Sequence, residues 1–178
     1  MRVIVQDPHD AKRFWLGTEE DGVYCSSNGG RHWERDSHGL DRSAVYAIAL
    51  HPQNRDWIYV GTYGRGVFQS TDGGGHWEER SRGLTDREVH SLVILPSDPS
   101  VILAGTLHRG LFRSTDGGGM WVHVTHDSSQ VWGLSVRSRG VCVPRLSGDI
   151  LGCLRRTGAS GACDGLGNGA GALLLNGT

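Results

Sequence analysis

The stretch Gly66 to Trp77, GVFQSTDGGGHW, decides the fold because it occurs three times in the chain. Gly110 to Trp121 is GLFRSTDGGGMW, and Gly22 to Trp33 is the looser copy GVYCSSNGGRHW. The closing tryptophans of the three copies are 44 residues apart. A period of this length indicates repeated supersecondary units, which bury their apolar faces only by stacking on neighbours.

Four short segments with β-strand composition make up each repeat, and the second repeat shows them best. Val45 to Leu50 is apolar on both faces, as expected for a strand buried on both sides. Trp57 to Thr62 is rich in β-branched and aromatic residues. Gly66 to Ser70 and Trp77 to Arg80 complete the set. The order predicts a four-stranded antiparallel meander.

The same pattern extends across the other repeats. First strands are expected at Val3 to Gln6 and Val89 to Ile94, and a further one begins at Val131. About 44 residues per unit with Gly-rich turns is typical of a β-propeller blade. The predicted fold is therefore all-β, a partial β-propeller of three four-stranded blades with one extra strand and an irregular tail. The expected boundaries are about 1–38, 39–82 and 83–127 for the blades and 131–136 for the strand.

Residues 137–178 differ in composition from the repeats. This tail is rich in Gly and Ala and contains no aromatic residue. Neither the Pro turn, the Gly-Thr strand nor the Asp-containing turn of a fourth repeat follows Val136. Two hypotheses stay open: a shift of the reading frame near residues 135–139, or a natural low-complexity tail.

The recurring turn has a structural explanation. Its Asp or Asn can accept hydrogen bonds from the backbone N–H groups that follow, and the glycines supply the positive φ that the reversal needs. The closing Trp would bury a large apolar surface, and we expect it to hold the outer strand against its neighbour. The predicted structural set is Ser26, Asn28, Trp33, Ser70, Asp72, Trp77, Ser114, Asp116 and Trp121.

This turn, S-x-D-G-G-x-x-W after an apolar strand, resembles the Asp-box or bacterial neuraminidase repeat over residues 1–136. The repeat is shared by sialidases, xyloglucan-active glycosidases, the sortilin ectodomain and photosystem II assembly-factor-like proteins. The resemblance implies a propeller whose Asp-box is a peripheral structural turn. It does not choose among these functions.

Candidate ligand-binding residues lie at the other end of the blades. In a meander, the loops between second and third strands share one end with the links between blades. These segments vary between repeats while the framework does not, and variable loops on a fixed scaffold are where binding sites are expected. The candidates are Glu19, Asp21, Tyr63, Arg65, Asp86, Glu88, His108 and Arg109.

Composition argues against several classes of function. The formal net charge of −1 gives no electrostatic basis for binding nucleic acid or a membrane. No motif predicts a cofactor, and His32 and His76 are replaced by Met120 in the third repeat, which argues against a metal site. Residues 1–6 show no signal peptide. We therefore expect a cytoplasmic protein as the sequence stands, and a secreted or periplasmic one if the N-terminus is truncated.

Two functional hypotheses remain. One is a non-catalytic propeller that binds a protein or a glycan through its loops. The alternative is a remnant of a sialidase-like or xyloglucanase-like glycoside hydrolase, with its catalytic residues in other blades. No carboxylate pair of the kind that glycosidases use can be recognised. Open edge strands at both ends also predict self-association.

Overall fold

A computed structural model of the chain describes residues 1–40, 42–125, 130–137, 140–144 and 150–154. The other residues include Asp41 and residues 126–129 of the predicted links between blades, and most of the tail. The hypothesis of a shifted reading frame therefore concerns residues that lie largely outside the described part.

Three four-stranded antiparallel sheets make up most of the chain, each with its strands in sequence order. The first contains β1 (Val3–Asp7), β2 (Asp10–Gly17), β3 (Val23–Ser26) and β4 (Glu34–Arg35). The second contains β5 (Val45–Leu50), β6 (Ile58–Thr62), β7 (Gly66–Ser70) and β8 (Glu78–Glu79). The third contains β9 (Val89–Leu95), β10 (Asp98–Thr106), β11 (Leu111–Ser114) and β12 (Val122–His123). The fold is the all-β partial propeller that the repeats predict.

The fourth sheet differs from the expectation. It begins at Ser135 rather than Val131, and two strands follow where the composition predicted an irregular tail. Its antiparallel strands are β13 (Ser135–Arg137), β14 (Gly140–Pro144) and β15 (Ile150–Leu154). GVCVP and ILGCL are short apolar runs, a composition that can form paired strands without the repeat motif.

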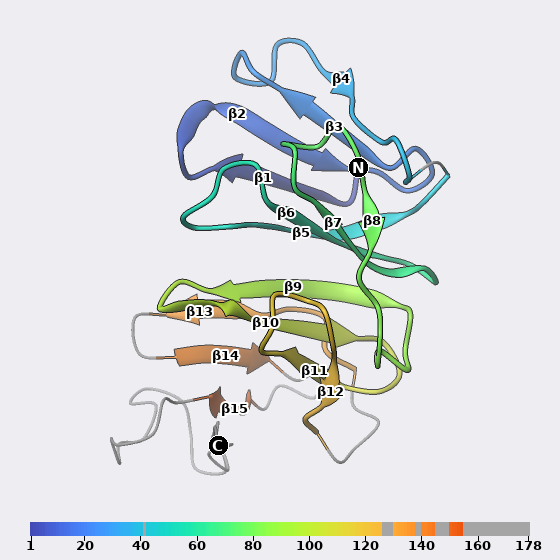
Figure 1. Ribbon diagram of the computed structural model, residues 1–178, viewed down its shortest axis with the longest axis vertical. Coiled ribbons are helices and arrows are strands. Elements are labelled where there is room, and N and C mark those ends of the chain that lie inside the picture. The colour runs from blue at the N-terminus through green and yellow to red at the C-terminus, as the bar shows by residue number, and fades with distance from the viewer. Residues whose placement is uncertain (41, 126–129, 138–139, 145–149, 155–178) are drawn as a thin grey trace.

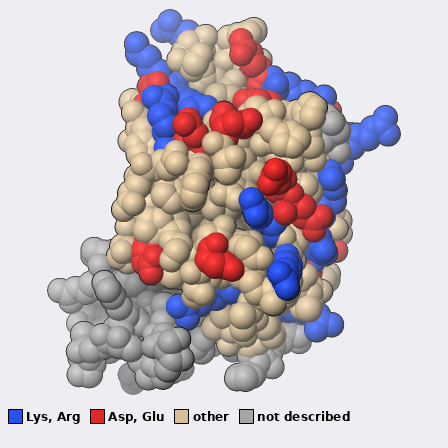
Figure 2. All heavy atoms as spheres, viewed as in Figure 1, with Lys and Arg blue, Asp and Glu red and all other residues tan. Residues whose placement is uncertain are grey.

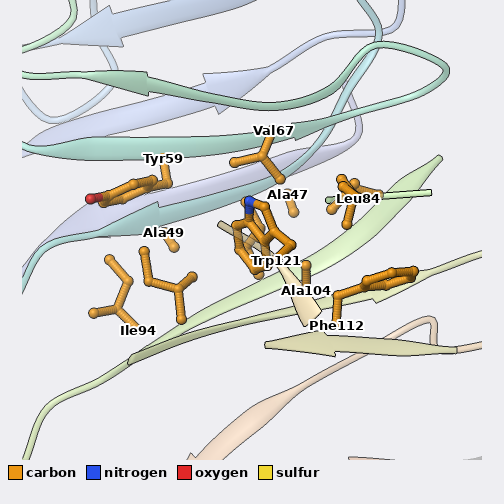
Figure 3. Close-up of a cluster of buried hydrophobic side chains, with 12 residues drawn as sticks. Ala47, Ala49, Tyr59, Val67, Leu84, Ile94, Ala104, Phe112 and Trp121 are labelled. Carbon is orange, nitrogen blue, oxygen red and sulfur yellow. The ribbon is translucent and has the colours of Figure 1, made fainter. Parts of the chain in front are cut away.

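Successive sheets stack on one another along the long axis of the molecule (Figure 1). The layers between sheets contain the core. Trp121 lies at the centre of one cluster, between Tyr59 and Val67 of the second blade and Phe112 of the third (Figure 3). Trp77 is part of the corresponding cluster between the first two blades. Each blade is therefore stabilised by its neighbours, as the repeat period requires.

The Gly-Thr pair that recurs in the second strands lies at the contact between blades. A methyl group added at Gly61 would lie 2.6 Å from Val89 Cγ1 of the next blade, and one at Gly105 would lie 2.5 Å from Val131 Cγ1. These separations are too short for any side chain, so glycine allows the close approach of the blades.

The Asp-box turns have the predicted hydrogen bonds. In the second blade, Asp72 Oδ1 accepts the His76 N–H at 3.0 Å, and Ser70 Oγ accepts the Gly74 N–H at 2.8 Å. Gly74 has a φ of 106°, which glycine adopts without strain. Asn28 accepts the equivalent bond from His32 at 2.9 Å. An amide oxygen therefore replaces the carboxylate, which supports a structural role for this position.

The closing tryptophans of the second and third blades, Trp77 and Trp121, hydrogen-bond across blades, a role that the sequence did not predict. The Nε1 of Trp77 donates to the main-chain oxygen of Asp36 at 2.9 Å, in the link that leaves the first blade. The Trp33 indole, in the first blade, donates to Gly30 of its own turn at 3.0 Å. Trp77 is buried and Trp33 is only half-buried. The tryptophan thus holds a blade to the one before it.

Candidate functional site

The loops between second and third strands meet the links between blades at one end of the sheets, as predicted. The Tyr63 N–H donates to Ala44 O at 2.9 Å, and the Leu107 N–H donates to Glu88 O at 3.0 Å. We call this end the loop face. It comprises the loops 18–22, 63–65 and 107–110 and the described residues of the links 36–44 and 80–88.

The Asp-box turns lie at the opposite end, beside the turns between first and second strands. The Gly73 N–H donates to Asp56 O at 2.9 Å, and the Gly117 N–H donates to Ser100 O at 2.9 Å. The Asp-box motif, the most recognisable part of the sequence, therefore lies at the opposite end of the blades from the variable loops.

A row of stacked side chains runs across the blades at the start of their first strands. We call it the stacked row, and it consists of Arg2, Tyr46, His90 and Trp132. The Arg2 guanidinium lies over the Tyr46 ring at 4.8 Å from its centroid. The Tyr46 and His90 rings are stacked, with centroids 4.8 Å apart and planes at 23°. Trp132 meets His90 edge to face, with a centroid distance of 4.6 Å.

β-Bulges project the central members of this row from the sheets. Val45 and Ala47 pair with adjacent residues of β6, so Tyr46 has no partner across the ladder. His90 is the extra residue of the equivalent irregularity in β9. A bulge bends a strand and redirects a side chain, and bulges are frequent beside functional sites. The backbone therefore places both rings in the row.

Two exposed aromatic side chains border this arrangement, one in the row and one beside it. Trp132 is 48% exposed, and Tyr63 of the loop face is 49% exposed. The Tyr63 ring lies edge-on to Tyr46, with centroids 5.7 Å apart, and at 6.5 Å from His90. The predicted candidate Tyr63 thus extends the row onto the loop face.

Two other predicted candidates are adjacent to the row. Glu88 lies in the link immediately before β9, two residues ahead of His90, and its Oε2 lies 3.3 Å from His108 Nε2 of the next loop. That contact is close enough for an ion pair, but it is not a hydrogen bond, and Glu88 Oε2 is buried without a hydrogen-bond partner. His90 Nε2 is likewise buried and without a partner. Such groups are rare in folded proteins and call for an explanation.

Asp86 is buried at the loop face and holds the neighbouring loop 107–110 in place. Its Oδ2 accepts the backbone N–H groups of His108 at 2.7 Å and Arg109 at 3.0 Å, and it is 7% exposed. Burial raises the pKa of Asp86, but these bonds and those from Glu88 and Thr106 outweigh burial and lower the pKa overall. The carboxylate fixes the 107–110 loop.

The remaining candidates lie apart from the row or are engaged elsewhere. Glu19 pairs with Arg2. Asp21 is exposed, and its main-chain oxygen accepts a bond from Arg35 Nε at 3.1 Å. Arg65 donates to Ser43 Oγ at 2.6 Å. Among the described residues, no hydrogen bond or ion pair joins the acidic candidates of the first blade to Asp86 or Glu88.

Burial and neighbouring charges set the protonation of His90. Burial lowers the pKa of its imidazole, and this effect outweighs the opposite influence of Glu88 and Asp86. Neutral His90 therefore predominates near neutral pH and stacks as an uncharged ring.

The sequence analysis missed the stacked row, although a signal for it was present. Arg2, Tyr46 and His90 occupy one repeat position at spacings of 44, and Trp132 follows after 42. Comparing the repeats at this position would have shown a variable polar or aromatic side chain at or just before the start of each first strand.

Within the described residues, no group of three or more His, Cys, Asp or Glu side chains could hold a metal ion. Nor do they form a helix of the length and apolar character needed to span a membrane.

Stacked four-stranded sheets with Asp-box turns define an Asp-box β-propeller protein. The family model for Sortilin-Vps10, described as "Sortilin, neurotensin receptor 3", matches residues 21–138. The chain belongs to this family. A comparison with curated proteins gave no match.

Similar solved structures include GH74 enzymes and a protein bound to a peptide. An ancestral GH74 enzyme superposes with a TM-score of 0.68 at 26% identity, over 80% of this chain and 21% of that one. The GH74 xyloglucanase of Xanthomonas campestris gives 0.61 at 20%, over 79% and 26%. YCF48 bound to D1 peptide gives 0.59 at 16%, over 79% and 50%. The chain thus spans between about a fifth and a half of these structures.

Proposed function

We propose that the chain is a non-catalytic part of a β-propeller that binds a protein or a glycan through its loop face. The observation that carries the proposal is the stacked row with Tyr63. Bulges place Tyr46 and His90 of this row next to the variable loops, and Trp132 of the row and Tyr63 beside it are each about half exposed. Exposed Tyr and Trp are the side chains most enriched in binding hot spots.

The charges of the loop face favour binding over catalysis. A glycosidase needs one carboxyl group as an acid and a second as a base or nucleophile, both directed at the substrate. Here Glu19 pairs with Arg2, Glu88 faces His108, and Asp86 is engaged by backbone N–H groups. None of the three forms a carboxylate pair.

The alternative is a remnant of a glycoside hydrolase whose catalytic residues lie in other blades. The 26% identity to an ancestral GH74 enzyme favours it. In that case the full-length protein would hydrolyse a polysaccharide, and this chain would contribute part of the substrate-binding surface.

The test combines binding with turnover. The full chain is titrated with neurotensin, with xyloglucan oligosaccharides and with 3′-sialyllactose, and assayed on chromogenic glycosides. We expect one probe to bind, Tyr63→Ala to weaken binding, and no turnover. The matched control is Trp57→Ala, which removes an exposed aromatic ring at the Asp-box end. Binding that responds to Trp57→Ala and not to Tyr63→Ala would contradict the proposal.

Association between copies is a separate part of the proposal. Ile4 of the first strand is 51% exposed, on the open side of the first sheet. An apolar surface left uncovered on a sheet face tends to associate with other chains. Sedimentation velocity should show concentration-dependent association that Ile4→Lys reduces, and a monomer at all concentrations would contradict this part.

A further inference from the structure

We infer that the stacked row, together with Tyr63 and Glu88, binds a neutral oligosaccharide. This inference rests on the proposed function, because it names the ligand class of the same loop face. Three observations carry it: exposed ring surfaces, buried polar atoms without hydrogen-bond partners, and charges that are already paired within the protein.

The exposed rings supply flat amphipathic surfaces. Trp132 and Tyr63 approach the central His90 from separate elements and are each about half exposed. The C–H groups on one face of a pyranose ring are weakly positive and can pack on the negative face of an aromatic ring. Tyr46 is covered by Arg2 and by His90, so it supports the surface without facing the ligand.

The polar atoms supply hydrogen bonds for hydroxyl groups. Glu88 Oε2 and His90 Nε2 are buried and have no hydrogen-bond partner in the described structure. Leaving a buried polar atom unpaired destabilises a protein by about 1–3 kcal/mol. A sugar hydroxyl can donate to the Glu88 carboxylate and can either donate to or accept from the imidazole. Ligand hydroxyls would thereby satisfy both atoms.

The charge pattern favours a ligand without net charge. Arg2, the basic member of the row, pairs with Glu19. Acidic and basic side chains are also interspersed over the visible surface (Figure 2). An anionic sugar or an acidic peptide would have to break the Arg2–Glu19 pair to find a counter-charge in the row.

The inference is tested by calorimetric titration of the full chain with cellohexaose, a neutral oligosaccharide. We expect saturable binding that Trp132→Ala and Tyr63→Ala each weaken at least about tenfold, equivalent to about 1.4 kcal/mol. Glu88→Gln should weaken it less, because the amide keeps one acceptor. Trp57→Ala should leave the affinity unchanged. Tyr63 lies in an exposed loop, so its variant reports on binding even if Trp132→Ala fails to fold.

The remaining outcomes separate the two proposals. If cellohexaose does not bind while neurotensin or 3′-sialyllactose binds and responds to Tyr63→Ala, the ligand class is wrong and the proposed function stands. If cellohexaose binds with equal affinity to wild type and to both aromatic variants, the location is wrong. If no probe responds to any loop-face variant, both proposals fail.

Discussion

The indole Nε1 of Trp121 donates a hydrogen bond of 2.7 Å to the main-chain oxygen of Arg80, in the link that leaves the preceding blade. Trp121 is 2% exposed. The bond therefore spans a buried contact between the second and third blades. In the second and third blades it explains why the Asp-box ends in Trp, since another apolar side chain would fill the space without this hydrogen bond.

Replacing this tryptophan should weaken the contact between blades. Trp121→Phe removes the donor and leaves the Arg80 carbonyl without this partner at the contact that Trp121 covers, so we expect a loss of about 1–3 kcal/mol in the free energy of unfolding. Trp33→Phe is the matched control, because Trp33 is half-buried and donates only to its own turn. Urea unfolding followed by circular dichroism measures both. Equal losses would show that the bond across blades contributes nothing.

A methyl group at Gly61 should be destabilising for a different reason. The added atom would lie 2.6 Å from Val89 Cγ1 and 3.0 Å from Val89 O, so the blades would have to separate. Overpacking of this kind costs about 1–3 kcal/mol. Gly61→Ala combined with Val89→Ala removes the nearer atom, and a double-mutant cycle should show favourable coupling. Additive losses would contradict a direct clash.

Much of the fold could be predicted because the same strand and turn pattern occurs three times in the sequence. The strand at Val45–Leu50 has the predicted bounds, and the Asp-box turns have the predicted bonds. The strands β14 and β15 could not be predicted by the same means, since they carry no repeat signature. Repeats predict the strands and turns that the blades share, but they give no information on segments that lack the repeat motif.

The candidate site was predicted only in part, for a related reason. Topology alone placed Tyr63 and Glu88 at the loop face. Tyr46 and His90 were not predicted because each lies within a first strand, and a first strand was expected to be buried on both faces. The bulges that redirect them depend on pairing with the neighbouring strand, and a one-residue shift of register is not visible in the sequence of one strand.

The Asp-box carboxylates should make stability depend on acidity. The N–H of His76 and then the hydroxyl of Ser70 lower the pKa of Asp72, and Ser114 and Met120 lower that of Asp116. A lowered pKa contributes stability that is present above the unfolded value, about 3.9, and is lost as the pH falls through the folded value.

The first blade offers a natural control for this effect, since Asn28 already replaces the carboxylate. We expect the double variant Asp72→Asn and Asp116→Asn to lose less stability than wild type between pH 4 and pH 2, in urea titrations at each pH. Both groups are exposed, so the difference should be small. Parallel pH profiles would mean that these bonds do not favour the ionised form.

His90 should give a pH dependence in a separate window. Burial lowers its pKa, against the opposing effect of Glu88 and Asp86 and with that of Arg2 and His108. Below about pH 6.5 the unfolded chain takes up a proton that folded His90 resists, so stability should fall as the pH drops from that value. His90→Phe keeps a ring between Tyr46 and Trp132 and should flatten this part of the profile, as should His90→Gln. Urea unfolding between pH 5 and pH 8 measures the slope, and an unchanged slope in His90→Phe would mean that the imidazole titrates alike in the folded and unfolded chain.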